Sequence, residues 1–170
     1  VKQDDSTNHT ASYHCCGYQM IEAHSGNPCE DCGIFVDLTV TIDTGASITL
    51  RDTDGDGYYE ISNADELYAF AALVNSGNTG INGKLTANIT INENVLTENG
   101  TLNEDAVSSF RTWSPIGMSF DMSYTGIFDG NDKTISGLYS TDCGLFHVIE
   151  KGSEVRDLGL IDSYFGGDWQ

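Results

Sequence analysis

Apolar and polar residues alternate along several stretches of the chain, and this alternation predicts short strands. Apolar side chains occupy every second position over 34–42, and the alternation resumes at Ile48 and Leu50 after a turn. A further alternating strand is predicted over 85–91. Because a period of two is typical of half-buried strands, the pattern favours a chain built mainly of β-strands.

One amphipathic helix is predicted around 63–76. Asn63 can cap its N-terminus, and Glu66 stands where it can complete a capping box. The apolar stripe with helical spacing consists of Leu67, Phe70, Ala71 and Val74. Because so short a helix is marginal in isolation, we expect it to lie against the strands.

Short apolar runs recur between Gly, Asn and Asp corners in the second half of the chain. Leu138 and Leu158, which have similar neighbours, are about twenty residues apart. This spacing indicates the stacked coils of a solenoid, although a Greek-key sandwich also has short strands. The segment 129–132 is predicted to be a coil corner, because Gly, Asn and Asp tolerate positive φ. The side chains expected to point into the core are Phe128, Ile135, Leu138, Leu145, Phe146, Leu158 and Leu160.

The composition excludes several classes of function. Among 170 residues, 26 are acidic and 7 are Lys or Arg, which gives a formal net charge of −19. We expect no nucleic-acid binding, because phosphate contacts come from Lys and Arg. No membrane insertion is expected either, since no apolar run reaches the ~20 residues of a membrane helix. The chain opens on Val1 without an export signal, so we expect a mature or excised fragment of an exported bacterial protein, secreted or held at the cell surface.

Cysteine and histidine gather in the segment 1–33, which we interpret as a small unit distinct from 34–170. Cys29 and Cys32 form a C-x-x-C-G knuckle of the kind that holds half of a tetrahedral Zn²⁺ site. The candidate zinc ligands are Cys16, His24, Cys29 and Cys32. The competing interpretation is disulfides among Cys15, Cys16, Cys29 and Cys32, since thiols normally pair outside the cytosol. Either kind of bond would staple a segment too poor in apolar residues to fold unaided.

An acidic loop after the second predicted strand is the candidate calcium site. Carboxylates on alternate residues, with glycine at the sixth position, can wrap oxygen ligands around Ca²⁺. The candidate ligands are Asp52, Asp54, Asp56, the Tyr58 carbonyl and Glu60. Asn63 stands at the twelfth position, where an EF-hand carries a bidentate glutamate, so we expect weak affinity. The alternative is a solvated acidic turn without metal.

The sequence offers no strong catalytic candidate. Cys143 is most simply a buried small apolar residue, and His147 a surface or corner residue. A β-helix enzyme would need carboxylates gathered in one groove. The charged residues available for such a groove are Asp129, Asp132, Asp142, Arg156, Asp157 and Asp162, and most of them fall at predicted corners.

Four motifs follow one another in the second half: W-S-P-I-G at 113–117, Y-T-G-I-F-D-G-N at 124–131, K-T-I-S-G-L at 133–138 and G-L-F at 144–146. With the closing V-R-D-L-G-L at 155–160, they resemble the GLUG-type repeat region of bacterial surface proteins, which include adhesin-like proteins and stalks of IgA-cleaving metallopeptidases. The resemblance implies the N-terminal portion of a right-handed parallel β-helix over 34–170, capped by the amphipathic helix. Two residues depart from the family pattern: His147 replaces the second glycine of G-L-F-G, and Asp157 replaces an asparagine.

The favoured hypothesis for function is a non-catalytic cell-surface or secreted module that is adhesin-like or part of a stalk. Its solenoid face would be presented for binding a glycan or a protein of a host. One alternative is a β-helix carbohydrate-active enzyme or an accessory region of a surface peptidase. Another is a self-assembling filament subunit, because the end of a β-helix exposes strand edges that can pair with another copy.

Overall fold

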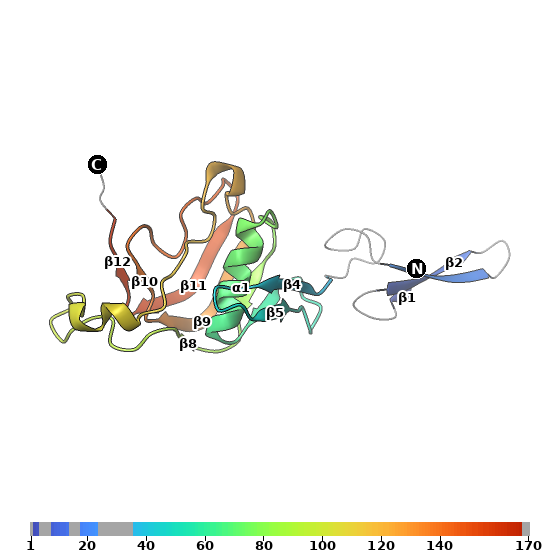
Figure 1. The fold of residues 1–170 in the computed structure, drawn as a ribbon. Helices are drawn as coiled ribbons and strands as arrows, with labels where there is room; N and C mark the ends of the chain where they lie inside the picture. Colours follow the sequence, from blue (N-terminus) through green and yellow to red (C-terminus); the bar gives the residue numbers. More distant parts are fainter. Residues whose placement is uncertain (1, 4–7, 14–17, 24–35, 168–170) are drawn as a thin grey trace.

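The structure is a computed structural model that describes residues 2–3, 8–13, 18–23 and 36–167 (Figure 1). Strands β1 (Lys2–Gln3), β2 (Asn8–Tyr13) and β3 (Tyr18–Ala23) form an antiparallel sheet in the order β1-β2-β3. The candidate zinc or disulfide residues Cys15, Cys16, His24, Cys29 and Cys32 lie outside the described residues.

The first predicted strand pair forms a hairpin. Strands β4 (Leu38–Thr41) and β5 (Ser47–Leu50) pair antiparallel, and the amide of Ile42 donates to the Ala46 carbonyl at 2.9 Å to close the turn. Gly45 in this turn has φ of +82°, a conformation that glycine adopts without strain. The hairpin is confirmed where the alternation and the turn predicted it.

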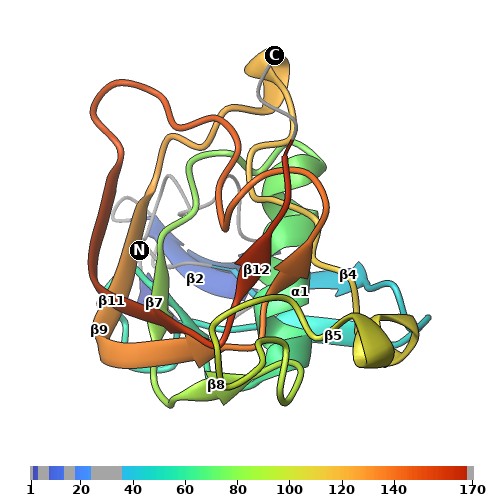
Figure 2. The same ribbon diagram turned by 90° about the vertical axis from the view of Figure 1, so that its left-hand side faces the viewer.

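The largest described sheet is parallel, and we call it the central sheet. Its strands are β6 (Tyr59–Ile61), β7 (Gly83–Leu85), β9 (Ile127–Ser136) and β11 (Glu154–Ile161), adjacent in that order and all parallel. Figure 2 shows β7, β9 and β11 side by side. Strand β8 (Ile89–Thr90) pairs with the far end of β9, also parallel. The chain is therefore mainly β, as predicted.

The single strand predicted over 85–91 is instead two strands, β7 and β8, and the reason lies in their partner β9. Asn131 and Asp132 in β9 have φ of 48° and 58°, which interrupts the ladder at this point. Side-chain amides bridge the break: Asn131 donates to the Leu85 carbonyl at 3.0 Å, and Asn88 accepts from the Thr134 amide at 3.0 Å. The neighbouring strand therefore divides opposite the irregularity.

The predicted corner at 129–132 is a bend within β9, which Figure 2 shows, and Asn131 and Asp132 have the positive φ expected there. Their positive φ values belong to a bulge that bends the strand without ending it. The adjacent strand β11 carries a matching irregularity: Asp157 has φ of 51°, and the register shifts between Arg156 and Leu158. Gly130 lets the two strands approach, since a Cβ there would collide with the Asp157 carbonyl.

Further parallel pairs lie beyond the central sheet. Strand β10 (Tyr139–Ser140) pairs parallel with β12 (Tyr164–Phe165), and Thr112 forms a parallel bridge to Tyr139 on the other side. Two more parallel bridges join Ile116 to Phe146 and Tyr124 to Ile149. Short 3₁₀ turns occupy Glu104–Ser109 and Phe120–Met122 in the connections.

Helix α1 (Ala64–Asn75) confirms the predicted helix. Its buried residues extend beyond the expected stripe and comprise Leu67, Tyr68, Ala69, Phe70, Ala71, Leu73 and Val74. The burial is wide because α1 packs against the β4–β5 hairpin and also against β6. Phe70 lies over Gly83 and makes edge-on contacts with the rings of Tyr124 and Phe128.

Helix α1 covers one side of the core, whereas apolar side chains of β11 are exposed. Phe128, Ile135, Leu138 and Leu145 are buried as predicted, but Leu160 is 41% exposed. Leu160 stands beside the buried Ile135, yet β11 is the last strand of the sheet, so nothing described covers it. Within the described residues, no helix is long and apolar enough to cross a membrane.

Candidate functional site

The acidic loop brings its three aspartates together. Asp52, Asp54 and Asp56 each offer a carboxylate oxygen, and these oxygens all lie within 4.8 Å of one another. Asp52 organises the loop: its carboxylate accepts from the amides of Gly55 at 2.8 Å and Gly57 at 2.9 Å. The loop therefore has the carboxylate cluster that a hard cation such as Ca²⁺ prefers.

An ammonium group already lies against this cluster. Lys84 of β7 donates to Asp54 at 3.1 Å and also to Asp56. Hydrogen bonding to Asp56 and Asp54 raises the pKa of Lys84, and the bond from Lys84 lowers the pKa of Asp54. The side chain of Lys84 is only 19% exposed, and its single positive charge offsets part of the negative charge of the loop.

Among the other candidate ligands, the Glu60 carboxylate already has a partner, while Tyr58 bonds to the loop through its amide, a different group from the carbonyl expected to bind metal. Glu60 accepts from the Thr53 hydroxyl at 2.5 Å, and the amide of Tyr58 donates to Asp56 at 3.0 Å. Asn63, at the twelfth position of the loop, caps α1 by accepting from the Glu66 amide at 3.0 Å. The loop is thus a cluster of three aspartates that could hold a cation, with Lys84 bonded to two of them.

The loop continues into a row of alternating charges across the parallel sheet. Glu60, Lys84, Asp129 and Arg156 stand side by side on β6, β7, β9 and β11. Arg156 donates to one Asp129 oxygen through Nε at 3.0 Å and Nη2 at 2.7 Å. Partial burial opposes ionisation of Asp129, but the bonds from Arg156 outweigh it and hold the pKa of Asp129 below its usual range.

A second cluster of charges joins the hairpin to the helix. Arg111 donates through Nε to Asp43 at 2.9 Å and through Nη1 to Asp65 at 2.7 Å. Its guanidinium carbon lies 3.6 Å from the centre of the Tyr68 ring, within cation–π range. The bond from Arg111 lowers the pKa of Asp43. Through Arg111, this cluster links the turn of the β4–β5 hairpin to helix α1.

The remaining single-residue candidates lie apart from these clusters. Cys143 is half-buried, not buried as expected, and its Sγ lies 3.3 Å from an oxygen of Asp142. Burial and this aspartate raise the pKa of the thiol, which opposes nucleophilic chemistry. His147 is exposed, and its amide donates to the Ile116 carbonyl at 2.9 Å.

Most of the carboxylates considered for a β-helix enzyme lie at bends or irregularities of the chain, as predicted, and some of these irregularities fall inside strands. Asp129, Asp132 and Asp157 are within strands β9 and β11. Asp162 follows β11 and accepts from the backbone amides of Val95 at 3.1 Å and Leu96 at 2.8 Å. Asp129 therefore serves an ion pair with Arg156, and Asp162 serves as an acceptor for backbone amides.

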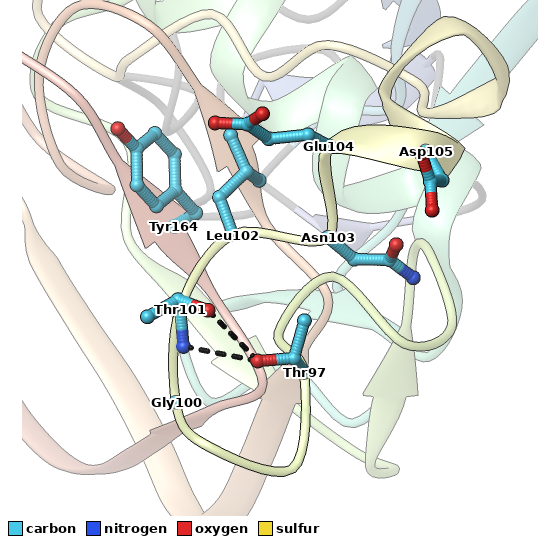
Figure 3. A pocket seen from close by; sticks show the side chains of 8 residues that line it. All are labelled: Thr97, Gly100, Thr101, Leu102, Asn103, Glu104, Asp105 and Tyr164. Atoms are coloured by element: carbon cyan, nitrogen blue, oxygen red, sulfur yellow. Dashed lines mark hydrogen bonds between the residues drawn. The ribbon is translucent and has the colours of Figure 1, made fainter.

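A polar hollow beside β12 was missed by the sequence interpretation (Figure 3). It has a volume of about 610 Å³ and is lined by Thr97, Gly100, Thr101, Leu102, Asn103, Glu104, Asp105 and Tyr164. Tyr164 lies about sixty positions beyond the rest of this lining. No local pattern in the sequence connects the two, although a loop rich in Thr, Asn, Glu and Asp is the kind of segment that lines polar sites.

No protein-family model, no curated protein and no solved structure matches the chain.

Proposed function

We propose that the chain is a non-catalytic display module, formed by the N-terminal portion of a right-handed parallel β-helix. It would belong to a bacterial surface or secreted protein of the adhesin-like or stalk kind, with GLUG-type repeats, and present its coils to a glycan or a protein of a host. The observation that carries the proposal is the parallel pairing of successive segments in the central sheet and beyond it. Parallel pairing of successive segments is what stacked coils require.

The pairing of charges supports a role without catalysis. Asp129 and Arg156 bind each other, and Lys84 binds the acidic loop. The pKa of Asp129 is lowered, whereas a general acid needs a raised pKa. These side chains are therefore better suited to holding adjacent strands than to moving protons.

Binding and turnover can be separated with the purified chain. It would be applied to arrays of glycans and of extracellular host proteins, then incubated with polysaccharides and peptides while new reducing ends and new amino termini are counted. Binding without release of either is expected. Release of reducing ends would contradict the proposal in favour of a carbohydrate-active enzyme, and release of amino termini would favour a peptidase.

The proposal includes a stapled N-terminal segment and weak calcium binding at the acidic loop. The staple is Zn²⁺ on Cys16, His24, Cys29 and Cys32, or disulfides among the four cysteines of the segment. Elemental analysis with counting of free thiols decides between them. One equivalent of zinc with reactive thiols after chelation supports the metal, and four blocked thiols without zinc support the disulfides. Four free thiols without zinc would contradict both.

A second candidate function is self-assembly, and the bare edge of β11 favours it. Val155 and Leu160 are 38% and 41% exposed, whereas their partners Phe128 and Ile135 in β9 are buried. A strand from another copy could pair there. Sedimentation at rising protein and salt concentrations tests this, since salt screens the net charge of −19. Assembly that Leu160→Lys abolishes would support it, and a monomer throughout would exclude it.

A further inference from the structure

The hollow beside β12 is built around one tyrosine ring. Tyr164 is half-buried, and its ring stacks on that of Tyr139 with centres 6.2 Å apart and planes 22° from parallel. Tyr139 in turn packs against Phe110, with ring centres 5.4 Å apart. The Tyr164 ring also lies over Gly166, where an added Cβ would come within 2.8 Å of it. The ring is therefore held in place before any ligand arrives.

Tyr164 and Leu102 are shared by a second hollow. This second hollow has a volume of about 330 Å³ and is lined also by Tyr139, Thr141, Gly166 and Gly167. Both volumes fall within the roughly 300–1,000 Å³ typical of small-molecule sites. The two hollows adjoin at one aromatic side chain, so a ligand that occupied both would be elongated and would cross the ring.

Several polar groups around the ring have no partner among the residues that the structure describes. Among the described residues, none forms a hydrogen bond or ion pair with the Tyr164 hydroxyl or with the carboxylates of Glu104 and Asp105. Figure 3 shows the Glu104 carboxylate on the side of the loop that faces Tyr164. Thr97 and Thr101 bond each other through their hydroxyls at 2.9 Å, which fixes the rim of the hollow.

The charge of the lining restricts the ligand. No Lys, Arg or His among the described residues lines either hollow, while Glu104 and Asp105 are acidic. With a net charge of −19 on the chain, an anionic ligand would be repelled. The charge therefore leaves neutral and cationic ligands, and the neutral kind that suits an aromatic ring beside a carboxylate has an apolar C–H face and several hydroxyl donors.

We propose that the two hollows bind a neutral oligosaccharide. One sugar would lay its C–H face on the Tyr164 ring, and its hydroxyls would donate to Glu104, whose carboxylate faces that ring in Figure 3. This inference rests on the proposed display function and assigns its binding site and ligand class. Because the hollows are open and polar, a dissociation constant on the order of 1 mM is expected.

Titration of the full, ¹⁵N-labelled chain with defined sugars tests the site. The probes are cellohexaose, mannohexaose and chitohexaose, with hexagalacturonic acid as the anionic control and a basic hexapeptide as the alternative class. At least one neutral sugar is expected to shift the amide signals of 97–105 and 164–167. No binding of any sugar at about 10 mM would overturn the assignment, as would tighter binding of the acid or the peptide.

Variants test whether the Tyr164 ring and the Glu104 carboxylate bind the sugar. Tyr164→Ala is expected to weaken binding at least about 10-fold, Tyr164→Phe much less, and Glu104→Gln about 5-fold. The matched control Asp121→Asn, on an exposed turn elsewhere, should leave binding unchanged. Sugar binding that Glu104→Gln and Tyr164→Ala leave intact in folded protein would overturn this site while the display function stood. Release of reducing ends would instead refute the display function and leave the site in place.

Discussion

Single side-chain amides join segments that are distant in sequence. Asn92 is 9% exposed; its amide nitrogen donates to the carbonyls of Arg111 at 3.0 Å and Gly137 at 2.8 Å, and its oxygen accepts from the Arg111 amide at 2.7 Å. Asn75 makes a similar set of bonds to Pro115 and Gly117. These residues stand where an irregular connection meets a strand or helix, so backbone groups are satisfied without regular structure.

Replacing Asn92 with alanine is expected to lower the free energy of unfolding by about 2–3 kcal/mol, because buried backbone groups would lose their partners. Urea denaturation measures the change. Asn99→Ala, in an exposed turn, is the matched control and should be neutral. A loss under about 0.5 kcal/mol at Asn92 would show that water replaces the amide.

Lys84 is expected to compete with calcium for the acidic loop. Lys84→Met removes the ammonium and leaves Asp52, Asp54 and Asp56 facing one another, so the variant should be destabilised without metal. Ca²⁺ should then raise its melting temperature more than that of the unaltered chain, by mass action. Thermal melts in EDTA, Mg²⁺ and Ca²⁺ test this. Equal calcium shifts in both proteins, or none in either, would contradict the competition.

At the scale of elements, local sequence patterns predicted α1 and the β4–β5 hairpin. The pairing of the parallel strands could not be predicted from such patterns, because the paired residues are distant in sequence. Asn63 caps α1 as predicted, but Glu66 completes the box by accepting from the Ser62 amide at 2.7 Å rather than from that of Asn63. The bend in β9 was predicted from its Gly, Asn and Asp residues, but only the pairing with β11 shows that the strand continues through the bend. The acidic loop was likewise predicted from local spacing, whereas Lys84 enters through a strand pairing.

The cap of α1 gives a direct test at this scale. Asn63→Ala should destabilise the protein by about 1 kcal/mol, because the Glu66 amide loses its acceptor. Asn63→Asp, which keeps an acceptor, should retain most of the stability. The comparison is made by chemical denaturation with helix content followed at 222 nm. Equal losses of stability in the two variants would mean that residue 63 does not stabilise the protein by capping the helix.

For the whole molecule, ion pairs link the elements against a large net negative charge. Arg111 pairs with Asp43 of the hairpin turn and with Asp65 of α1, and Arg156 pairs β11 with β9. The aspartates held in these pairs include Asp43 and Asp129, and the pKa of each is lowered. Lowering the pH therefore has two opposite effects on the stability of the fold. Protonation reduces repulsion among carboxylates, which is stabilising, and breaks these ion pairs, which is destabilising.

Comparing the stability of the unaltered chain with that of Asp43→Asn at each pH isolates the contribution of the Asp43–Arg111 ion pair. A carboxylate whose pKa is lowered on folding stabilises fully above its unfolded pKa, near about 4, and loses that contribution as the pH falls through its folded pKa. The stability difference between the two proteins should therefore be largest above about pH 5 and shrink below about pH 4. Denaturation at a series of pH values measures it, with Asp121→Asn as control. A difference independent of pH would exclude the ion pair as its source.

The parallel ladders of the central sheet also make the molecule mechanically anisotropic. Their hydrogen bonds run between strands, from β6 toward β11. A pull along the strands would load many bonds together, whereas a pull from one end of the stack to the other would break them one pair at a time. A force along the strand direction would therefore be resisted, whereas a force across the stack would separate the strands one after another from an end of the sheet, β6 or β11, each of which has a single neighbouring strand in it.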